Sequence, residues 1–384
     1  MRTCAFFAAF MDIGLFLEML NIDSTSGVEA GFVDFLATKL AGPGRKISVF
    51  EVGDGTKNLL VSWGTPRVLF CTHLDTVPPY IAPVVENSSE TGDVVINGRG
   101  SCDAKGQIFA MYEACKELEA KGCSDFGLLL LAGEETGSFG AKAFSAMADE
   151  SGKSIFHDDA WVVVGEPTDN FMASAAKGTK SFEVTFTGKA CHSGYPENGS
   201  SAVMYFNDFM NALRSIVFPV DEVLGETTWN VGKLTSDNPQ NILSEKLTCR
   251  VYFRTTFESD EMVCNVMKNI AGTDAKLRFG RRKVQDGSDI VAKDVTDWQR
   301  AISVVAFGGD VPSRFDVLPG FETKPVSFGS DAPQLKCFRN KILCGPGSIL
   351  VAHKDEEYIR ISDIKTAVSN YVRMYELINE RINK

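Results

Sequence analysis

The hydrophobic and polar positions up to about residue 175 alternate between short apolar runs and segments of helical periodicity. The apolar runs 68–71, 128–131 and 161–164 predict buried strands. The segment 107–121 has apolar residues at helical spacing, and Gly122 follows it as a helix-ending glycine. Strands that alternate with helices are typical of a parallel sheet flanked by helices.

The pattern changes in the middle of the chain. The segments 180–187 and 247–256 alternate apolar and polar residues, which predicts half-exposed antiparallel strands, and 275–279 predicts a further strand. Helical periodicity predicts helices at 200–216 and 264–271. This part of the chain therefore reads as an α+β insertion with a mostly antiparallel sheet.

After about residue 289 the first pattern resumes, and it ends in a helix for which Ser362 is the predicted N-cap. The sequence therefore predicts the α/β fold class. Residues 1–176 and 290–384 form one discontinuous domain with a mostly parallel central sheet flanked by helices. Residues 177–289 form a smaller lid-like domain inserted into it.

Composition supports this layout and excludes several classes of protein. A chain of 384 residues exceeds one ordinary core, and its 44% hydrophobic and 23% charged residues are typical of a folded protein. A net charge of −11 argues against nucleic-acid binding. No apolar stretch reaches the roughly 20 residues that span a bilayer.

The ends of the chain and its cysteines bear on location. The apolar N-terminus predicts a helix, with Met11 as an alternative biological start. Ten cysteines without a C-x-x-C pair are best explained as reduced thiols of a cytoplasmic protein.

Polar residues able to bind a metal follow the predicted buried strands. His73 and Asp75 follow the run 68–71, and an aspartate at this spacing can orient a metal-bound imidazole. In open α/β sheets, active sites collect at the carboxyl ends of strands. A structural histidine near a loop is the alternative, and this motif alone does not decide between the two.

Carboxylates follow the next two strands. Glu134 and Glu135 come after 128–131, and Glu166 comes after 161–164. Two adjacent carboxylates at a buried strand end repel each other, and a nearby cation or a bound proton would relieve that cost. Exposure in a surface loop is the alternative.

Two further candidates lie in turns. Asp103 lies in the glycine-rich turn 98–106 before a helix, where an N-capping role is the alternative. His353 lies in a polar turn before the last helix.

Taken together, these residues indicate a metal site. Two imidazoles and three carboxylates without a cysteine suit zinc, with cobalt or manganese as alternatives. Five ligands exceed one open catalytic site, so two ions that share a carboxylate are the economical arrangement. One carboxylate would stay unligated as a general base, and either member of the Glu134-Glu135 pair could supply it.

The set resembles the two-zinc aminoacylase and peptidase family that includes acetylornithine deacetylase, succinyl-diaminopimelate desuccinylase and carboxypeptidase G. The matching motifs run from Thr72 to Glu356, which is most of the chain. The resemblance implies two zinc ions with Asp103 between them. One ion would be held by His73 and Glu166, and the other by Glu135 and His353.

The resemblance also implies roles for residues that bind no metal. Glu134 would be the general base, and Asp75 the hydrogen-bonding partner of His73. His192 would help polarise the scissile carbonyl, often from a partner subunit. The residues implied in substrate binding are Asn241, Arg254, Gly329, Ser330 and Gly347.

Two positions in the insertion depart from the family pattern. Ser244 stands where many relatives have proline, and Thr255 does not continue their usual strand pattern. Both positions lie in the insertion, so they bear on which substrate is recognised rather than on the metal site.

The favoured function is a zinc-dependent deacylase of N-acyl amino acids, similar to acetylornithine deacetylase or succinyl-diaminopimelate desuccinylase. A dipeptidase or carboxypeptidase of the same family is the second interpretation. A metal-dependent binding protein without catalysis is a third, against which the complete set of ligands, base and lid histidine argues. The expected partners are a small N-acyl amino acid or short peptide and a second copy of the chain, through the lid domain.

Overall fold

The computed structural model describes residues 11, 13–53, 55–88, 91–150, 155–271 and 302–382. The described residues form two compact units. The first unit contains the residues up to Ser174, Phe315–Lys324 and those from Ser330 onward. The second unit contains residues from Ala175 to Arg314 and Pro325–Gly329.

A six-stranded sheet forms the centre of the first unit, in the order β1-β2-β6-β3-β7-β15. Strand β3 is parallel to both β6 and β7, and β15 is parallel to β7. Strand β2 is antiparallel to both of its neighbours, β1 and β6. Every residue of β3, β6 and β7 is buried, so the three predicted strands and the mixed α/β class are confirmed. The strands are β1 Lys46–Gly53, β2 Thr56–Trp63, β3 Val68–His73, β6 Phe126–Leu131, β7 Trp161–Val164 and β15 Asn340–Leu343.

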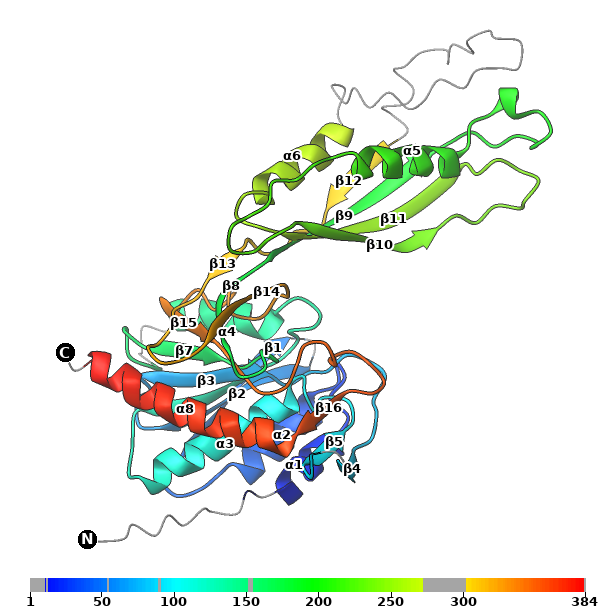
Figure 1. The fold of residues 1–384 in the computed structure, drawn as a ribbon. Helices are drawn as coiled ribbons and strands as arrows, with labels where there is room; N and C mark the ends of the chain where they lie inside the picture. The colour runs from blue at the N-terminus through cyan, green and yellow to red at the C-terminus, as the bar shows by residue number, and fades with distance from the viewer. Residues whose placement is uncertain are drawn as a thin grey trace. The chain divides into compact units, whose positions relative to one another are not determined.

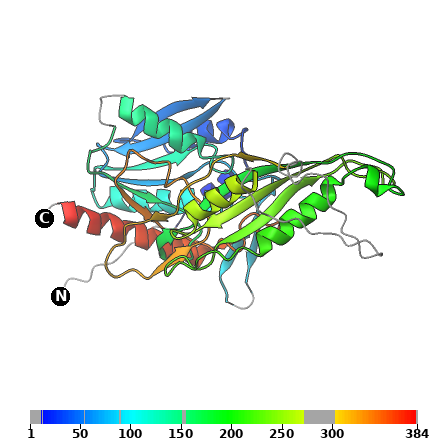
Figure 2. The same cartoon turned by 90° about the horizontal axis from the view of Figure 1, so that it is seen from above.

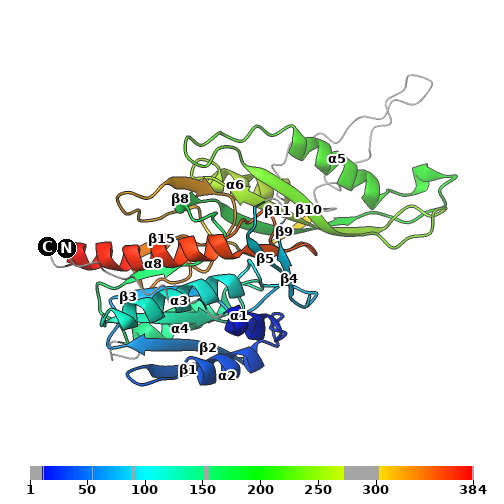
Figure 3. The same cartoon turned by 60° about the horizontal axis from the view of Figure 1, so that its bottom comes forward.

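Helices cover both faces of this sheet. Residues of α1 (Ile13–Leu20), α2 (Ala30–Lys39), α3 (Lys105–Ala120) and α8 (Ile361–Ile382) share one apolar core with alternate residues of the strands. Figures 1 and 3 both show α8 beside α3. Aromatic pairs within this core include Phe16 with Phe109, whose ring centres lie 4.9 Å apart, and Phe70 with Tyr371, whose ring centres lie 5.5 Å apart.

The opposite face is covered by α4 (Phe139–Glu150). Phe144 of this helix packs against Phe50 of β1 and against Phe338. Because successive residues of a strand point to opposite faces, Phe50 and its neighbour Val49 face different sides of the sheet.

The predicted end of one helix is confirmed, and the predicted N-cap of another is wrong. Gly122 has φ +74°. The N–H groups of Gly122 and Cys123 donate to the main-chain oxygens of Glu119 and Leu118, so glycine ends α3 as expected. Ser362 is not the N-cap of α8, because the helix begins at Ile361, directly after β16 (Tyr358–Arg360). The Ser362 hydroxyl instead donates to the Asp93 carboxylate.

A small three-stranded sheet has the order β16-β5-β4, with β4 at Val84–Asn87 and β5 at Val94–Asn97. In this sheet β16, which follows His353 in the sequence, pairs with β5, which precedes Asp103.

The second unit has an antiparallel sheet in the order β10-β11-β9-β12. Figures 1 and 2 show α5 and α6 on the same face of it, where Phe186, Phe209 and Phe253 belong to the core. Its elements are β9 Gly178–Thr187, η1 Pro196–Asn198, α5 Ala202–Arg214, β10 Thr228–Thr235, β11 Lys246–Thr255, α6 Asp260–Ala271 and β12 Ile302–Ala306. The chain also contains short strands β8 Met172–Ala176, β13 Ser313–Arg314 and β14 Thr323–Val326.

The strands and helices predicted for the insertion are present, except that 275–279 lies outside the described residues. The helix predicted at 264–271 begins earlier, at Asp260, where two acidic residues favour a helix start. The predicted domain limits, 177–289 for the insertion, stay a prediction, and β12 beyond them also belongs to the second unit. None of the described helices is long and apolar enough to cross a bilayer.

Candidate metal centre

The candidate residues of the first unit follow parallel strands. Strands β3, β6, β7 and β15 run in the same direction, so their carboxyl ends lie at one edge of the sheet. His73 ends β3, the Glu134-Glu135 pair follows β6, and Glu166 follows β7. The chain that leaves β15 leads to His353.

One group of possible ligands is buried around His73. Its Nε2 atom lies 2.8 Å from Asp103 Oδ1. Ligand atoms of His73, Asp103 and Glu166 all lie within 4.8 Å of one another, and all three side chains are buried.

A second group lies around His353. Its Nε2 atom is 2.9 Å from Glu135 Oε1 and 3.3 Å from Asp103 Oδ2. Asp103 therefore belongs to both groups and presents a different oxygen to each histidine. This is the arrangement expected of a carboxylate that bridges two cations.

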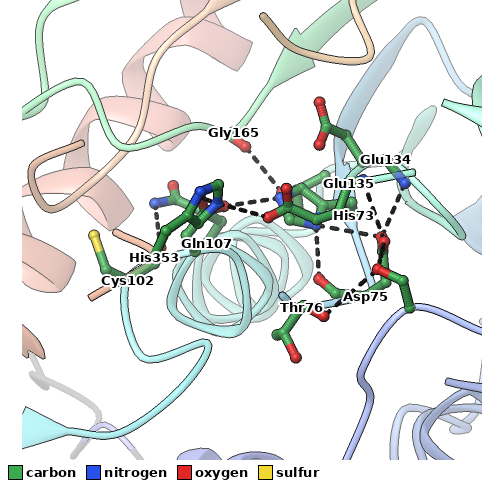
Figure 4. Close-up of polar contacts among 12 residues, drawn as sticks. His73, Asp75, Thr76, Cys102, Gln107, Glu134, Glu135, Gly165 and His353 are labelled. Atoms are coloured by element: carbon green, nitrogen blue, oxygen red, sulfur yellow. Dashed lines mark hydrogen bonds and ion pairs between the residues drawn. The ribbon is translucent and has the colours of Figure 1, made fainter. Parts of the chain in front are cut away.

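Asp75 connects His73 to the Glu134-Glu135 turn (Figure 4). The Nδ1 atom of His73 makes its short contact, 2.8 Å, with the main-chain oxygen of Asp75, and the carboxylate lies 3.5 Å away. The Asp75 carboxylate accepts the N–H groups of Glu134 at 2.9 Å and Glu135 at 3.2 Å, and the hydroxyl of Ser26 at 2.7 Å. One side chain thus holds the turn that carries both glutamates.

Burial makes this cluster electrostatically unfavourable without a cation. Burial raises the pKa of Glu134 and of Glu166 well above the usual range, and neighbouring carboxylates add to the rise. Hydrogen bonds to Asp103 and Glu135 raise the pKa of His353 to about 10. Burial opposes ionisation of Asp103, but hydrogen bonds from His353 and His73 hold the pKa of Asp103 below its usual value. An oxygen and nitrogen donor set of this charge fits divalent cations.

Hydrogen bonds from outside the cluster hold its loops. Thr72 donates its hydroxyl to the oxygen of Gly165, beside Glu166, at 2.9 Å. Gln107 donates to the oxygens of Cys102, at 3.0 Å, and Pro346, at 2.7 Å, and so joins the Asp103 loop to the loop after β15.

Two of the residues implied in substrate binding, Ser330 and Gly347, belong to the first unit, and both are buried. Gly347 has φ +76°, and a Cβ atom there would lie 2.5 Å from the Cys102 sulfur, so only glycine allows this approach. Ser330 is buried, and its hydroxyl accepts the N–H of Ala332 at 3.3 Å.

The other predicted substrate residues belong to the second unit. His192 accepts the N–H of Gly194 on Nδ1 at 3.0 Å, and the neighbouring Ser193 donates its N–H to the oxygen of Asn241 at 2.9 Å. The Arg254 guanidinium lies 5.0 Å from the centre of the Tyr252 ring. Arg254 and Gly329 are in the same unit, whereas every candidate metal ligand is in the first unit.

Comparison with known proteins identifies the family. A sequence model of the family described as Peptidase family M20/M25/M40 matches residues 69–377. A protein of Emericella nidulans named a probable carboxypeptidase is 31% identical, over 96% of this chain and 90% of its own length. The chain belongs to the M20/M25/M40 peptidase family. The resemblance stated from the sequence is thereby confirmed.

Solved structures with the M20 fold are also similar to this chain. A tripeptidase of Staphylococcus aureus has a TM-score of 0.74 and 18% identity, over 95% of this chain and 97% of its own. A metallo-carboxypeptidase of Sulfolobus solfataricus has a TM-score of 0.67 and 17% identity, over 95% of this chain and 98% of its own. At these identities the likeness concerns the fold, which supports the α/β unit with a second, antiparallel unit.

Sequence reasoning missed residues that support the centre from outside. Gln107 was hidden in a helical pattern, and Ser26 in a polar loop. Arg99 and Glu357 form a buried ion pair, although Glu357 ends the charged run 354–357, which is typical of an exposed turn. No local pattern marks these residues, since each has a partner that is distant in sequence.

Proposed function

We propose that this M20-family protein is a metal-dependent hydrolase that cuts an amide bond whose leaving amine carries a free carboxylate. The observation that carries the proposal is the position of Asp103, shared by two groups of ligand atoms that each contain one histidine. Short peptides and N-acyl amino acids both contain such a bond.

The residues of the first unit fit two cations. His73 and Glu166 would hold one, Glu135 and His353 the other, and Asp103 both. Two imidazoles and three carboxylates suit zinc, with cobalt or manganese as alternatives. Two such ions would lower the pKa of an attacking water molecule and stabilise negative charge on the substrate oxygen.

Glu134 is the proposed general base. It lies beside both ligand groups, with a carboxylate oxygen within 4.8 Å of atoms of His73 and Glu135, yet the five proposed ligands do not require it. Its turn is fixed by the bond from its own N–H to Asp75. Glu134 would take a proton from the attacking water and pass it to the leaving amine.

The substrate assignment draws on the second unit and on the relatives. An arginine such as Arg254 is suited to a bidentate hold on a carboxylate. The relative named a probable carboxypeptidase supports a peptide with a free C-terminus. The proposed roles of His192, Asn241 and Gly329, and a homodimer through the second unit, rest on the family resemblance.

A substrate screen tests the proposal. The zinc-supplemented protein would be assayed with dipeptides and tripeptides, with N-acetyl and N-succinyl amino acids including acetylornithine and succinyl-diaminopimelate, and with C-terminally amidated peptides. We expect hydrolysis only where a free carboxylate is present. Equal rates on amidated peptides would contradict the carboxylate requirement. Metal binding without turnover of any substrate would favour the binding-protein alternative.

A further inference from the structure

A buried ion pair lies beside the proposed bridging residue without being a ligand. Arg99 Nη1 is 2.7 Å from Glu357 Oε2, and the two side chains are 1% and 0% exposed. The same guanidinium donates to the main-chain oxygens of Pro79, at 3.3 Å, and Lys354, at 3.0 Å. One arginine therefore connects three segments, and one of them directly follows His353.

The other oxygen of Glu357 holds the Asp103 loop. Glu357 Oε1 accepts the backbone N–H groups of Cys102 and Asp103, each at 3.0 Å. In addition, the main-chain oxygen of Glu357 accepts the N–H of Gly98 at 2.9 Å. Both ends of the loop 98–103 are thus fixed by a residue more than 250 positions away in the sequence.

Stability alone is a poor reason for this pair. Burying two charges costs several kcal/mol of desolvation per ion, and well-packed apolar residues often replace a buried pair without loss. Glu357 is also fully buried and contacts the backbone of Asp103, a second buried acidic residue. A carboxylate is therefore a costly choice here, unless its two oxygens are needed to orient the peptide groups next to Asp103.

We infer that Arg99 and Glu357 are positioning residues for the bridging carboxylate. By fixing the backbone of Cys102 and Asp103, Glu357 holds the two Asp103 oxygens toward His73 and His353. Arg99 neutralises Glu357 and joins it to the chain after His353. This inference rests on the proposed function, since it assumes that Asp103 bridges two cations.

The test is metal binding by Glu357→Gln. A glutamine cannot accept hydrogen bonds on both terminal atoms, so either Arg99 or the Cys102 and Asp103 N–H groups lose a partner. Removal of such outer hydrogen-bonding partners typically weakens metal affinity or activity about 10–100-fold. Calorimetric titration of the metal-free protein with Co²⁺ should show a fall in affinity of that size. The visible spectrum of the cobalt protein should change, and kcat should fall more than KM rises.

Two control variants separate positioning from stability. Glu356→Gln alters the exposed neighbour of Glu357. Glu119→Gln breaks the Arg45–Glu119 pair, and Glu119 lies in the last turn of α3, at the opposite end of that helix from Asp103. Both should bind Co²⁺ with wild-type affinity and spectrum, even where Glu119→Gln lowers the melting temperature. If Glu357→Gln does not fold, Arg99→Lys, which keeps the charge but not the planar fork, is titrated instead. Wild-type Co²⁺ affinity and spectrum in the folded variant would overturn the inference. Failure of the wild-type chain to bind two ions would instead overturn the proposed function.

Discussion

The Asp75 carboxylate accepts the backbone N–H of Glu134 at 2.9 Å, although the two residues follow different strands of the sheet. The same side chain accepts the N–H of Glu135 at 3.2 Å, and its main-chain oxygen contacts His73. One aspartate therefore sets the positions of a proposed ligand from each group and of the proposed base.

Asp75→Asn should weaken both metal binding and turnover. The asparagine amide offers one acceptor oxygen where the aspartate offers two, so one N–H of the Glu134-Glu135 turn loses its partner. We expect a loss of about 10–100-fold in metal affinity or kcat. Calorimetric titration and steady-state kinetics would measure it. Asp34→Asn, which changes an exposed aspartate of α2, is the control. Equal behaviour of the two variants would contradict the role of Asp75.

Glu134→Gln should keep its metal and lose nearly all turnover. Glutamine preserves the shape of the side chain but cannot accept a proton, and removal of a general base typically costs about 10²–10⁴-fold in rate. Elemental analysis should find as much metal as in the wild type, and kcat should fall within that range. A variant with near-normal kcat would rule out Glu134 as the base.

The proximity of the centre's residues was predictable because it follows from topology. Once three apolar runs are parallel strands of one sheet, their carboxyl ends share an edge, and His73, Glu135 and Glu166 follow those ends. Asp103 and His353 follow no buried strand and were candidates only as polar residues in turns, and the family resemblance supplied their roles.

Other features were not predictable, for physical reasons. Strand β2 contains Asn58, which is buried and bonds across to Gly140 and Ala132, and this interrupts the apolar signal of the strand. The Arg99–Glu357 pair joins residues 258 positions apart. Such pairing depends on the completed fold, since each partner alone resembles a surface charge.

Metal removal should lower the melting temperature of the wild-type protein. The buried carboxylates repel one another, and a ligand that binds only the folded state stabilises it by about 2.7 kcal/mol at a hundredfold excess over its Kd. Differential scanning calorimetry with and without a chelator would measure the change. Asp103→Ala removes the residue shared by both groups and should show little response to added zinc. An unchanged melting temperature in the wild type would contradict a metal centre at this site.

The Arg45–Glu119 pair should make the free energy of unfolding depend on pH. Glu119 accepts hydrogen bonds from Arg45 Nε at 2.9 Å and Trp63 Nε1 at 2.8 Å, and the bonds from Arg45 foremost hold the pKa of Glu119 below its usual 4.5. A carboxyl whose pKa is lower in the folded state contributes stability above its unfolded pKa. That contribution is lost as the pH falls from about 4.5 through the lower folded value.

Glu119→Gln should therefore be less stable than the wild type at pH 7, by about 1 kcal/mol at most for this partly exposed pair, and should approach it in acid. Urea unfolding between pH 7 and the lowest pH at which the protein stays folded would measure the difference. Glu117→Gln, which alters an exposed pair with Lys121 on the same helix, serves as the control. A difference for Glu119→Gln that stays constant with pH would show that packing, rather than the ionised carboxylate, accounts for the loss.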